Sequence, residues 1–397
     1  MLERLGGGRF SSPIAKYYAY AATTRVSFTA AVWILFVRAQ GLSYTEIGVL
    51  NALWWVTLVV SEIPTGYLGD RLGRRNGMLL GTGVVAVATA ALGLSTTFRE
   101  FAVVYALWAV GQTFRSGSDD AWLYDVLARE ERAHEFAAVR GKAAALGFGI
   151  GAVTAPVGGA LADWRFSVPF FATAAVTALG VPILLTVPEV DAGGDRFTVR
   201  DASRVIRRHL SRPPLRSFVL YVALVFGLGE MVYVFDQPIV AAVAADLGVP
   251  ASAEKTAVGL AYGVFTVGTA VASFHTDAIR ERLGLRGWFA LAPLVLGLSY
   301  VGLWAVPLLA GPVFLLARGV AVVSLTLGNQ HVNDEVESVG RATVLSAASM
   351  VYWLTVAPVE LLGGVVADAV SPAGALAVFG VLVLCCTGAL WVLERPV

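Results

Sequence analysis

Ionisable side chains interrupt several long apolar stretches of this 397-residue sequence, and they are the residues best suited to chemistry. A charge at the centre of a bilayer is costly, so such residues usually pair with one another or serve proton and ligand pathways. A carboxylate can also take up and release a proton, whereas an arginine stays charged. The seven positions are Arg25, Glu62, Arg115, Glu230, Asp236, Arg318 and Glu360.

A rise of about 1.5 Å per helical residue gives each of these side chains a depth, and depth matching predicts three ion pairs. The predicted pairs are Arg25 with Glu230, Glu62 with Arg115, and Arg318 with Glu360. Asp236 is left without a dedicated partner, although it could compete for Arg318. Proton coupling needs an acid that changes its protonation state, which favours Asp236 first and Glu230 second. The alternative is that all these acids form permanent structural pairs.

A glycine-rich, charged loop lies between the second and third apolar segments and reads Gly66-Tyr67-Leu68-Gly69-Asp70-Arg71-Leu72-Gly73-Arg74-Arg75. Position for position, it resembles the cytoplasmic loop signature of the major facilitator superfamily, G-x-L-x-D-R-x-G-R-R. The resemblance implies a secondary transporter in which this loop holds the two halves together in the outward-facing state. It implies a gating role, rather than a substrate site, for Gly66, Gly69, Asp70, Arg71, Gly73, Arg74 and Arg75. The alternative is a loop that only fixes topology through its positive charge.

A second polar segment closes the fourth apolar stretch and runs from Arg115 to Asp125. It resembles the S-G-x-x-x-A-x-x-Y-D segment of a branch of facilitators that includes many drug exporters, and 62–66 fits the same branch. We expect one or more of Asp119, Asp120 and Asp125 to face the arginines of the gating loop. The superfamily's Arg-x-x-Gln-Gly signature is not intact in this helix, and the glycine-proline signature of antiporters around 147–159 is only approximate. Both departures weaken the inference of export.

Twelve apolar segments are each long enough to cross a bilayer, since a span needs about 20 residues. Apolar residues make up 57% of the chain and charged residues 14%, which is typical of an all-α integral membrane protein. We predict spans at 14–38, 44–68, 76–97, 100–123, 140–162, 165–187, 215–241, 254–279, 287–307, 311–332, 342–368 and 372–393. No removable signal peptide is expected.

An internal repeat divides the predicted spans into two six-helix bundles, 1–187 and 215–397, joined by a basic linker at 188–214. The sequence 155–163 in the fifth span resembles 357–368 in the eleventh, and 70–75 after the second span resembles 281–286 after the eighth. Parallel repeats of this kind are typical of facilitators, with the substrate held between the halves. Part of the linker, 198–210, is either a basic amphipathic helix on the inner leaflet or a solvated connection. All but seven of the 29 Lys and Arg lie on the side of both termini, which predicts cytoplasmic termini in a plasma-membrane protein.

In that fold, as the resemblance implies, the first, fourth, seventh and tenth helices line the cavity. Aromatic residues on them suit lipophilic or cationic ligands. Candidates for the substrate cavity are Tyr20, Phe28, Tyr105, Trp108, Phe226 and Tyr233.

We therefore expect a monomeric twelve-helix facilitator that exports small amphipathic compounds in exchange for protons. The alternatives are an importer of a polar nutrient, and a membrane receptor or lipid-handling protein on the same fold. We expect no catalytic site and no metal site, because the sequence shows no nucleophile with a base and no metal-ligand spacing. It shows no phosphate-binding glycine loop, so an ATP-driven pump is not expected. No cofactor and no nucleic-acid partner are expected either.

Overall fold

The computed structural model describes residues 12–189, 213–336 and 341–394, and all regular structure in these ranges is helical. Ten stretches of the described chain are long and apolar enough to cross a membrane. The helices correspond to the twelve predicted spans, so the predicted fold class is confirmed. The first and fourth predicted spans fall outside the ten, since the first is broken into short helices and the fourth carries several charges. The proposed amphipathic helix at 198–210 lies outside the described residues.

The chain forms two compact units. Unit 1 comprises Met1–Gln40, Val56–Gly194 and Pro250–Thr266, and unit 2 comprises Gly41–Trp55, Asp195–Val249 and Val267–Val397. These units differ from the predicted bundles in two short segments, 41–55 and 250–266, each of which groups with the other half of the chain. Both segments include the N-terminal part of a long helix, so α3 and α12 each belong partly to both units.

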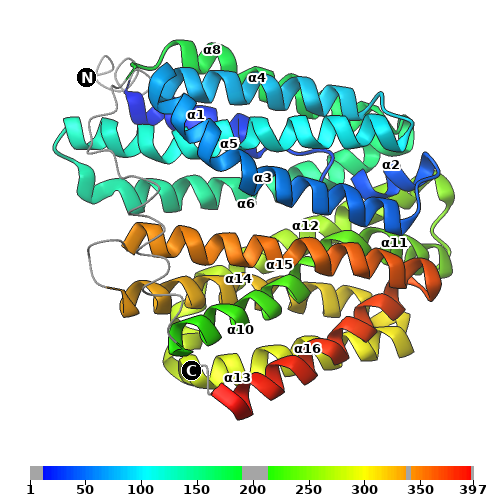
Figure 1. Ribbon diagram of the computed structural model, residues 1–397. Helices are drawn as coiled ribbons and strands as arrows, with labels where there is room; N and C mark the ends of the chain where they lie inside the picture. Colours follow the sequence, from blue (N-terminus) through cyan, green and yellow to red (C-terminus); the bar gives the residue numbers. More distant parts are fainter. Residues whose placement is uncertain (1–11, 190–212, 337–340, 395–397) are drawn as a thin grey trace, which may run out of the picture. The chain divides into compact units, whose positions relative to one another are not determined.

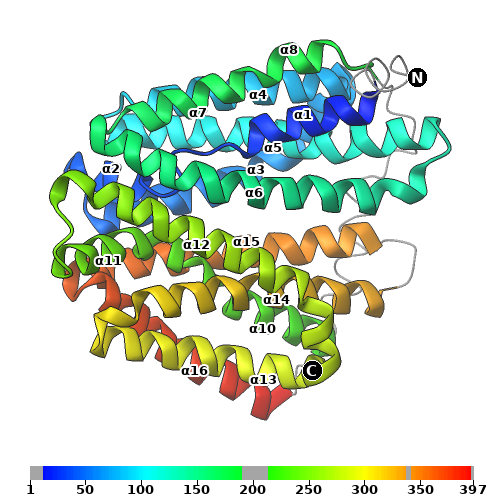
Figure 2. The ribbon, with the colours of Figure 1, turned by 180° about the vertical axis from the view of Figure 1, so that it is seen from behind.

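Unit 1 is built from the following helices: α1 (Pro13–Arg25), α2 (Trp33–Ala39), most of α3 (Tyr44–Leu72), α4 (Arg74–Leu92), α5 (Phe98–Arg129), α6 (Phe136–Trp164), α7 (Val168–Ala178), α8 (Gly180–Leu185) and the larger part of α12 (Glu254–Phe274). α5 packs along α4, and α1 lies against α6 and α8, as the reverse view in Figure 2 shows. A capping box between Thr97 and Glu100 fixes the start of α5 by satisfying backbone N–H groups that have no partner in the helix.

Unit 2 is built from the following helices: α10 (Pro213–Glu230), α11 (Val232–Asp246), α13 (Thr276–Ala305), α14 (Ala310–Glu335), α15 (Arg341–Ala369), α16 (Pro372–Glu394), the start of α3 and the end of α12. α10 packs against α14 and α15, and α13 packs against α16 (Figure 1). The Tyr300 hydroxyl donates to the Leu228 carbonyl at 3.1 Å, which ties α13 to α10 inside this unit.

The first predicted span, 14–38, is not a continuous helix. α1 ends at Arg25, Val26 is extended, and α2 begins only at Trp33. Within this break the Phe28 amide donates to the Thr173 hydroxyl of α7 at 3.0 Å. Irregular backbone at membrane depth is tolerated where neighbouring protein groups satisfy it or where it lines a cavity. The seventh span shows a smaller interruption at Met231, directly after Glu230.

The repeated sequences in the fifth and eleventh spans form the same structure in each unit. In unit 1 the Asp163 carboxylate of α6 accepts from the amides of Lys255 and Thr256 at 3.2 and 2.8 Å, and from the Thr256 hydroxyl at 2.7 Å. In unit 2 the Asp368 carboxylate of α15 accepts from the amides of Tyr44 and Thr45 at 3.0 and 2.8 Å, and from the Thr45 hydroxyl at 2.7 Å. Each aspartate thus caps the N-terminal turn of a helix, where a negative charge is favourable.

A glycine of each repeat allows the close approach that these caps require. A Cβ on Gly159 would lie 2.2 Å from the Lys255 carbonyl oxygen, and a Cβ on Gly364 would lie 2.2 Å from that of Tyr44. Both distances are far inside van der Waals contact with rigid backbone, so the two glycines are needed for packing.

Candidate functional site

The loop that resembles the facilitator signature is a sharp turn between two helices of unit 1. α3 continues to Leu72, Gly73 adopts a φ of 92°, and α4 begins at Arg74. A positive φ of this kind is strained for residues with a side chain. The corresponding turn of unit 2 has Gly284 at a φ of 66°, so the second copy of the motif is also a turn.

Charged partners of this turn come from α5 and from the end of the sixth span. The Arg74 Nε lies 3.8 Å from a carboxylate oxygen of Asp125. The Arg71 guanidinium lies over the ring of Tyr67, 4.6 Å from its centroid. Gly69 packs toward Ser118 of α5, whereas Gly66 is exposed. The side chain of Asp70 is outside the described part of the structure.

Glu189 is a partner of the turn that the sequence analysis did not identify. Its carboxylate accepts from the Arg75 amide at 3.1 Å and lies 3.5 Å from the Arg75 Nε. It therefore places a negative charge at the N-terminal turn of α4, where the helix dipole favours one. The available signal was an acid directly after the proline that ends the sixth span, Pro188.

Asp119 and Asp120 have other neighbours than the predicted arginines of the gating loop. Asp120 forms an ion pair with Arg140 of α6 at 2.5 Å. The Asp119 charge interacts with those of Asp120, Arg115, Arg140 and Arg25. Of the three predicted aspartates, Asp125 alone forms an ion pair with the loop among the described residues.

The predicted pair between Glu62 and Arg115 is wrong. Glu62 lies on an exposed face of α3, and no ion pair joins it to Arg115 in the described part of unit 1. The charged neighbours of Arg115 are Asp119 and Arg25. Depth matching placed the two residues at one level but could not give the direction in which each side chain points.

The predicted pair between Arg318 and Glu360 is also wrong. The Arg318 guanidinium of α14 binds the Asp236 carboxylate of α11 at 2.5 Å, and their side chains are 4% and 0% exposed. The Tyr233 ring packs against the same guanidinium, 4.4 Å from its centroid. Asp236 therefore has an ion-pair partner, Arg318, which the predicted pairing did not give it. It is no longer the first candidate for the proton-coupling residue.

Two further acids share this region of unit 2. Glu230 is half-buried at the end of α10, and its charge interacts with that of Arg318. Glu360 of α15 is buried, accepts from the indole N–H of Trp55 at 3.0 Å, and is close enough to Glu230 for their charges to repel. The predicted partner of Glu230, Arg25, belongs to unit 1, so that pair stays a prediction.

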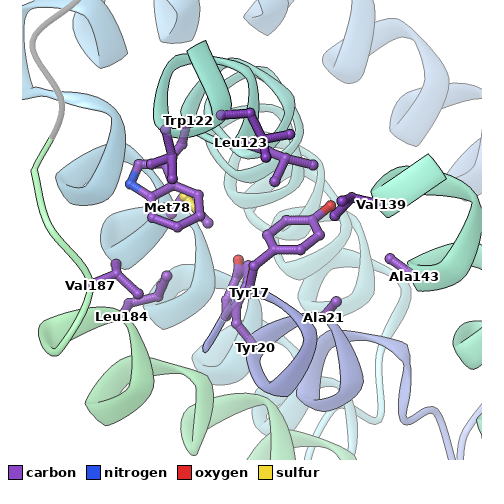
Figure 3. Close-up of a cluster of buried hydrophobic side chains, with 12 residues drawn as sticks. Tyr17, Tyr20, Ala21, Met78, Trp122, Leu123, Val139, Ala143, Leu184 and Val187 are labelled. Carbon is purple, nitrogen blue, oxygen red and sulfur yellow. The ribbon is translucent and has the colours of Figure 1, made fainter. Parts of the chain in front are cut away.

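The six aromatic residues predicted for the cavity fall into a buried group and a half-buried group. Tyr20, Tyr105 and Phe226 are at most 3% exposed and pack inside their own units. The Tyr20 hydroxyl, for example, pairs with that of Thr82 at 2.9 Å, and Figure 3 shows Tyr20 and Tyr17 within a cluster that includes Met78 and Trp122. The half-buried members of the set are Phe28, Trp108 and Tyr233.

Comparisons with known proteins agree with this architecture. The family model described as Major Facilitator Superfamily matches residues 17–328. The crystal structure of the nucleoside transporter NupG superposes with a TM-score of 0.77 at 11% identity, covering 97% of this chain and 98% of that one. A bacterial homolog of the human lysosomal transporter Spinster, in an inward-facing and unoccupied conformation, gives a TM-score of 0.76 at 16% identity and covers 98% of both chains.

Two curated relatives match over shorter stretches. The uncharacterized MFS-type transporter MJ1560 of Methanocaldococcus jannaschii is 26% identical over 147 residues, 37% of both chains. The membrane sensor protein UhpC of Escherichia coli is 34% identical over 99 residues, 25% of this chain and 22% of that protein. The matched part of this chain thus spans well under half the length of the curated relatives.

Proposed function

Because the chain belongs to the Major Facilitator Superfamily, we propose that it is a proton-coupled secondary transporter that exports small amphipathic compounds by alternating access. It is a multi-pass membrane protein with the fold of that family. The proposal places it in the plasma membrane with both termini in the cytoplasm, as the distribution of Lys and Arg predicts.

The proposal of proton coupling rests on the charge balance of one cluster in unit 2. The cluster contains one base, Arg318, and three acids, Asp236, Glu230 and Glu360. With every acid ionised it would hold two uncompensated negative charges inside a membrane, which is expensive. Uptake of a proton removes one of these charges, so the occupancy of the cluster by protons affects its stability.

Glu230 is the acid in this cluster that best suits proton transfer. Asp236 is held by Arg318, and Glu360 accepts a hydrogen bond from Trp55. Glu230 stands at the interruption between α10 and α11 and is only half-buried, so water can approach it more readily than it can approach the other two. A proton moving on and off Glu230 would change the charge beside Arg318, which links protonation to the packing of α11 and α14.

Export of amphipathic compounds rests on the resemblance of the 115–125 segment to that of drug exporters. The membrane sensor among the relatives supports a second candidate, a receptor that binds its ligand without transporting it. Reconstituted protein separates the candidates: a transporter accumulates substrate in liposomes under an imposed pH gradient, and the direction of the gradient distinguishes exchange from symport. A receptor binds the same compound without accumulation.

Glu230→Gln tests the coupling mechanism. We expect this variant to lose accumulation driven by a pH gradient while it retains counterflow, the exchange of labelled for unlabelled substrate across the membrane. The matched control is Glu62→Gln, which removes an acid from an exposed helical face in unit 1. Gradient-driven accumulation that survives in the Glu230 variant would exclude this residue as the proton carrier.

A further inference from the structure

Two arginines of unit 1 interact electrostatically, and neither has a bound carboxylate among the described residues. Arg25 is the last residue of α1, at the break in the first span, and Arg115 is in α5. Their charges are close enough to repel. Among the described residues, neither guanidinium has a carboxylate oxygen within 4.0 Å or a hydrogen bond. Arginines elsewhere in both units, such as Arg140 and Arg318, do have ion-pair partners.

The position of Arg25 is supported by the helix beside it. Gly147 of α6 packs under the Arg25 side chain, and a Cβ on this glycine would lie 3.1 Å from the Arg25 Cδ and 3.5 Å from its Nε. The absence of a side chain at 147 leaves room for the guanidinium to lie across α6. Arg25 is exposed and Arg115 is half-buried, so a ligand can reach both.

The nearby charges leave an excess of one positive charge. The ion pair between Asp120 and Arg140 is neutral by itself. The other charges are Arg25, Arg115 and the single acid Asp119, which interacts with both arginines. One carboxylate compensates only one of the two guanidinium groups, so one positive charge is left over. A ligand with one negative charge would neutralise the group.

The face of α5 that carries Arg115 also indicates the shape of such a ligand. Trp108, Gln112, Arg115 and Asp119 are spaced by four, three and four residues, which places them on one side of the helix. Trp108 is about 10 Å from Arg115 along the axis, at a rise of about 1.5 Å per residue. A charged head at Arg115 and an apolar body extending to Trp108 would therefore fit this face.

We propose that Arg25 and Arg115 bind the anionic head of a small amphipathic monoanion, such as an organic carboxylate. Arginine binds a carboxylate through two parallel N–H···O bonds, a geometry that lysine does not offer. Gln112 adds a neutral hydrogen-bonding group one turn from Arg115, and Trp108 packs against the apolar body. The assignment of this ligand as the transported compound rests on the proposed function, but its binding does not.

The test compares three probes with the same apolar body and different heads: 4-phenylbutyrate, 4-phenylbutanol and 4-phenylbutylamine. The full chain in detergent is heated at pH 7 with each probe, and the shift in melting temperature gives an apparent affinity. We expect stabilisation by the carboxylate alone. Arg115→Gln and Arg25→Gln should each weaken it at least tenfold, whereas Arg165→Gln, which removes an exposed arginine after α6, should leave it unchanged.

Other results would overturn the proposal. Equal stabilisation by all three probes would show that the head group is not recognised. Stabilisation by sodium phosphate or chloride, with no further effect of 4-phenylbutyrate, would assign the arginines to an inorganic anion. If Arg115→Gln does not fold, Arg115→Lys keeps the charge without the paired N–H geometry, and unchanged carboxylate affinity in it would also exclude the site. Because no proton gradient is used, a failure of Glu230-dependent coupling does not alter these results.

Discussion

The ion pair between Asp236 and Arg318 gives a prediction whose magnitude can be worked out from the structure. The two side chains are in contact at 2.5 Å and are 0% and 4% exposed. Removing one partner of a buried pair leaves an uncompensated charge and costs about 3–5 kcal/mol. The single variant Arg318→Gln should therefore lower the free energy of unfolding by about that amount, and Asp236→Asn should lower it by less, because the Glu230 charge still interacts with Arg318.

The double variant should cost much less than the sum of the two. It replaces two buried charges with two amides that can hydrogen-bond to each other, so neither side chain remains as an unpaired charge. We expect a coupling energy of at least about 2 kcal/mol, within the range of about 1.5–7 kcal/mol found for close charge pairs. The measurement is a double-mutant cycle on unfolding in mixed micelles of dodecyl maltoside and sodium dodecyl sulfate.

A second pair in the same unit supplies the control. Arg280 and Asp334 lie 3.6 Å apart, but their side chains are 46% and 57% exposed. Exposed pairs contribute about 0–1 kcal/mol, so the same cycle on this pair should give a coupling energy in that range. If the buried cycle is additive within about 0.5 kcal/mol, the two residues do not interact and the reasoning on the unit 2 cluster is refuted.

The single variants should also differ from each other in their response to pH. Arginine cannot lose its proton in a protein, whereas an unpaired buried acid can avoid the cost of its charge by taking up a proton. Lowering the pH should therefore restore part of the stability of Arg318→Gln and none of that of Asp236→Asn. Equal recovery in both variants would contradict this account of the pair.

Three further predictions concern the helix ends and the gating loop. Asp163→Ala should destabilise the protein by about 1.5–3 kcal/mol or more, because it removes a charged acceptor from the Lys255 amide. Unchanged thermal unfolding of this variant would exclude the capping role. Gly364→Ala should lower the folded yield, since the new Cβ would lie 2.2 Å from the Tyr44 carbonyl oxygen, and normal yield with normal melting would show that the approach is not tight. Asp70→Asn should impair transport while leaving ligand binding intact, because the gating loop affects the balance of conformations; full transport activity in this variant would contradict the gating role.

The sequence alone predicted the features that depend on local composition and spacing. The lengths of the apolar segments predicted the helices, since a span requires about 20 apolar residues whatever it packs against. The loop ending at Arg75 was identified by residue types at fixed offsets, and the structure shows the turn at Gly73 that its glycines indicate. The repeat that ends in Asp163 and Asp368 was visible as similarity, and it forms equivalent caps in the two units.

The partners of the charged residues were decided only by the tertiary structure. Depth along a helix follows from residue number, but the direction of a side chain around the axis depends on how the helices pack and where they break. Arg318 therefore binds Asp236 rather than Glu360, and Arg75 binds Glu189, which lies 114 residues away along the chain. Arg25 stands at the end of a broken helix, a position that hydropathy could not reveal because the residues after it are as apolar as a helix would require.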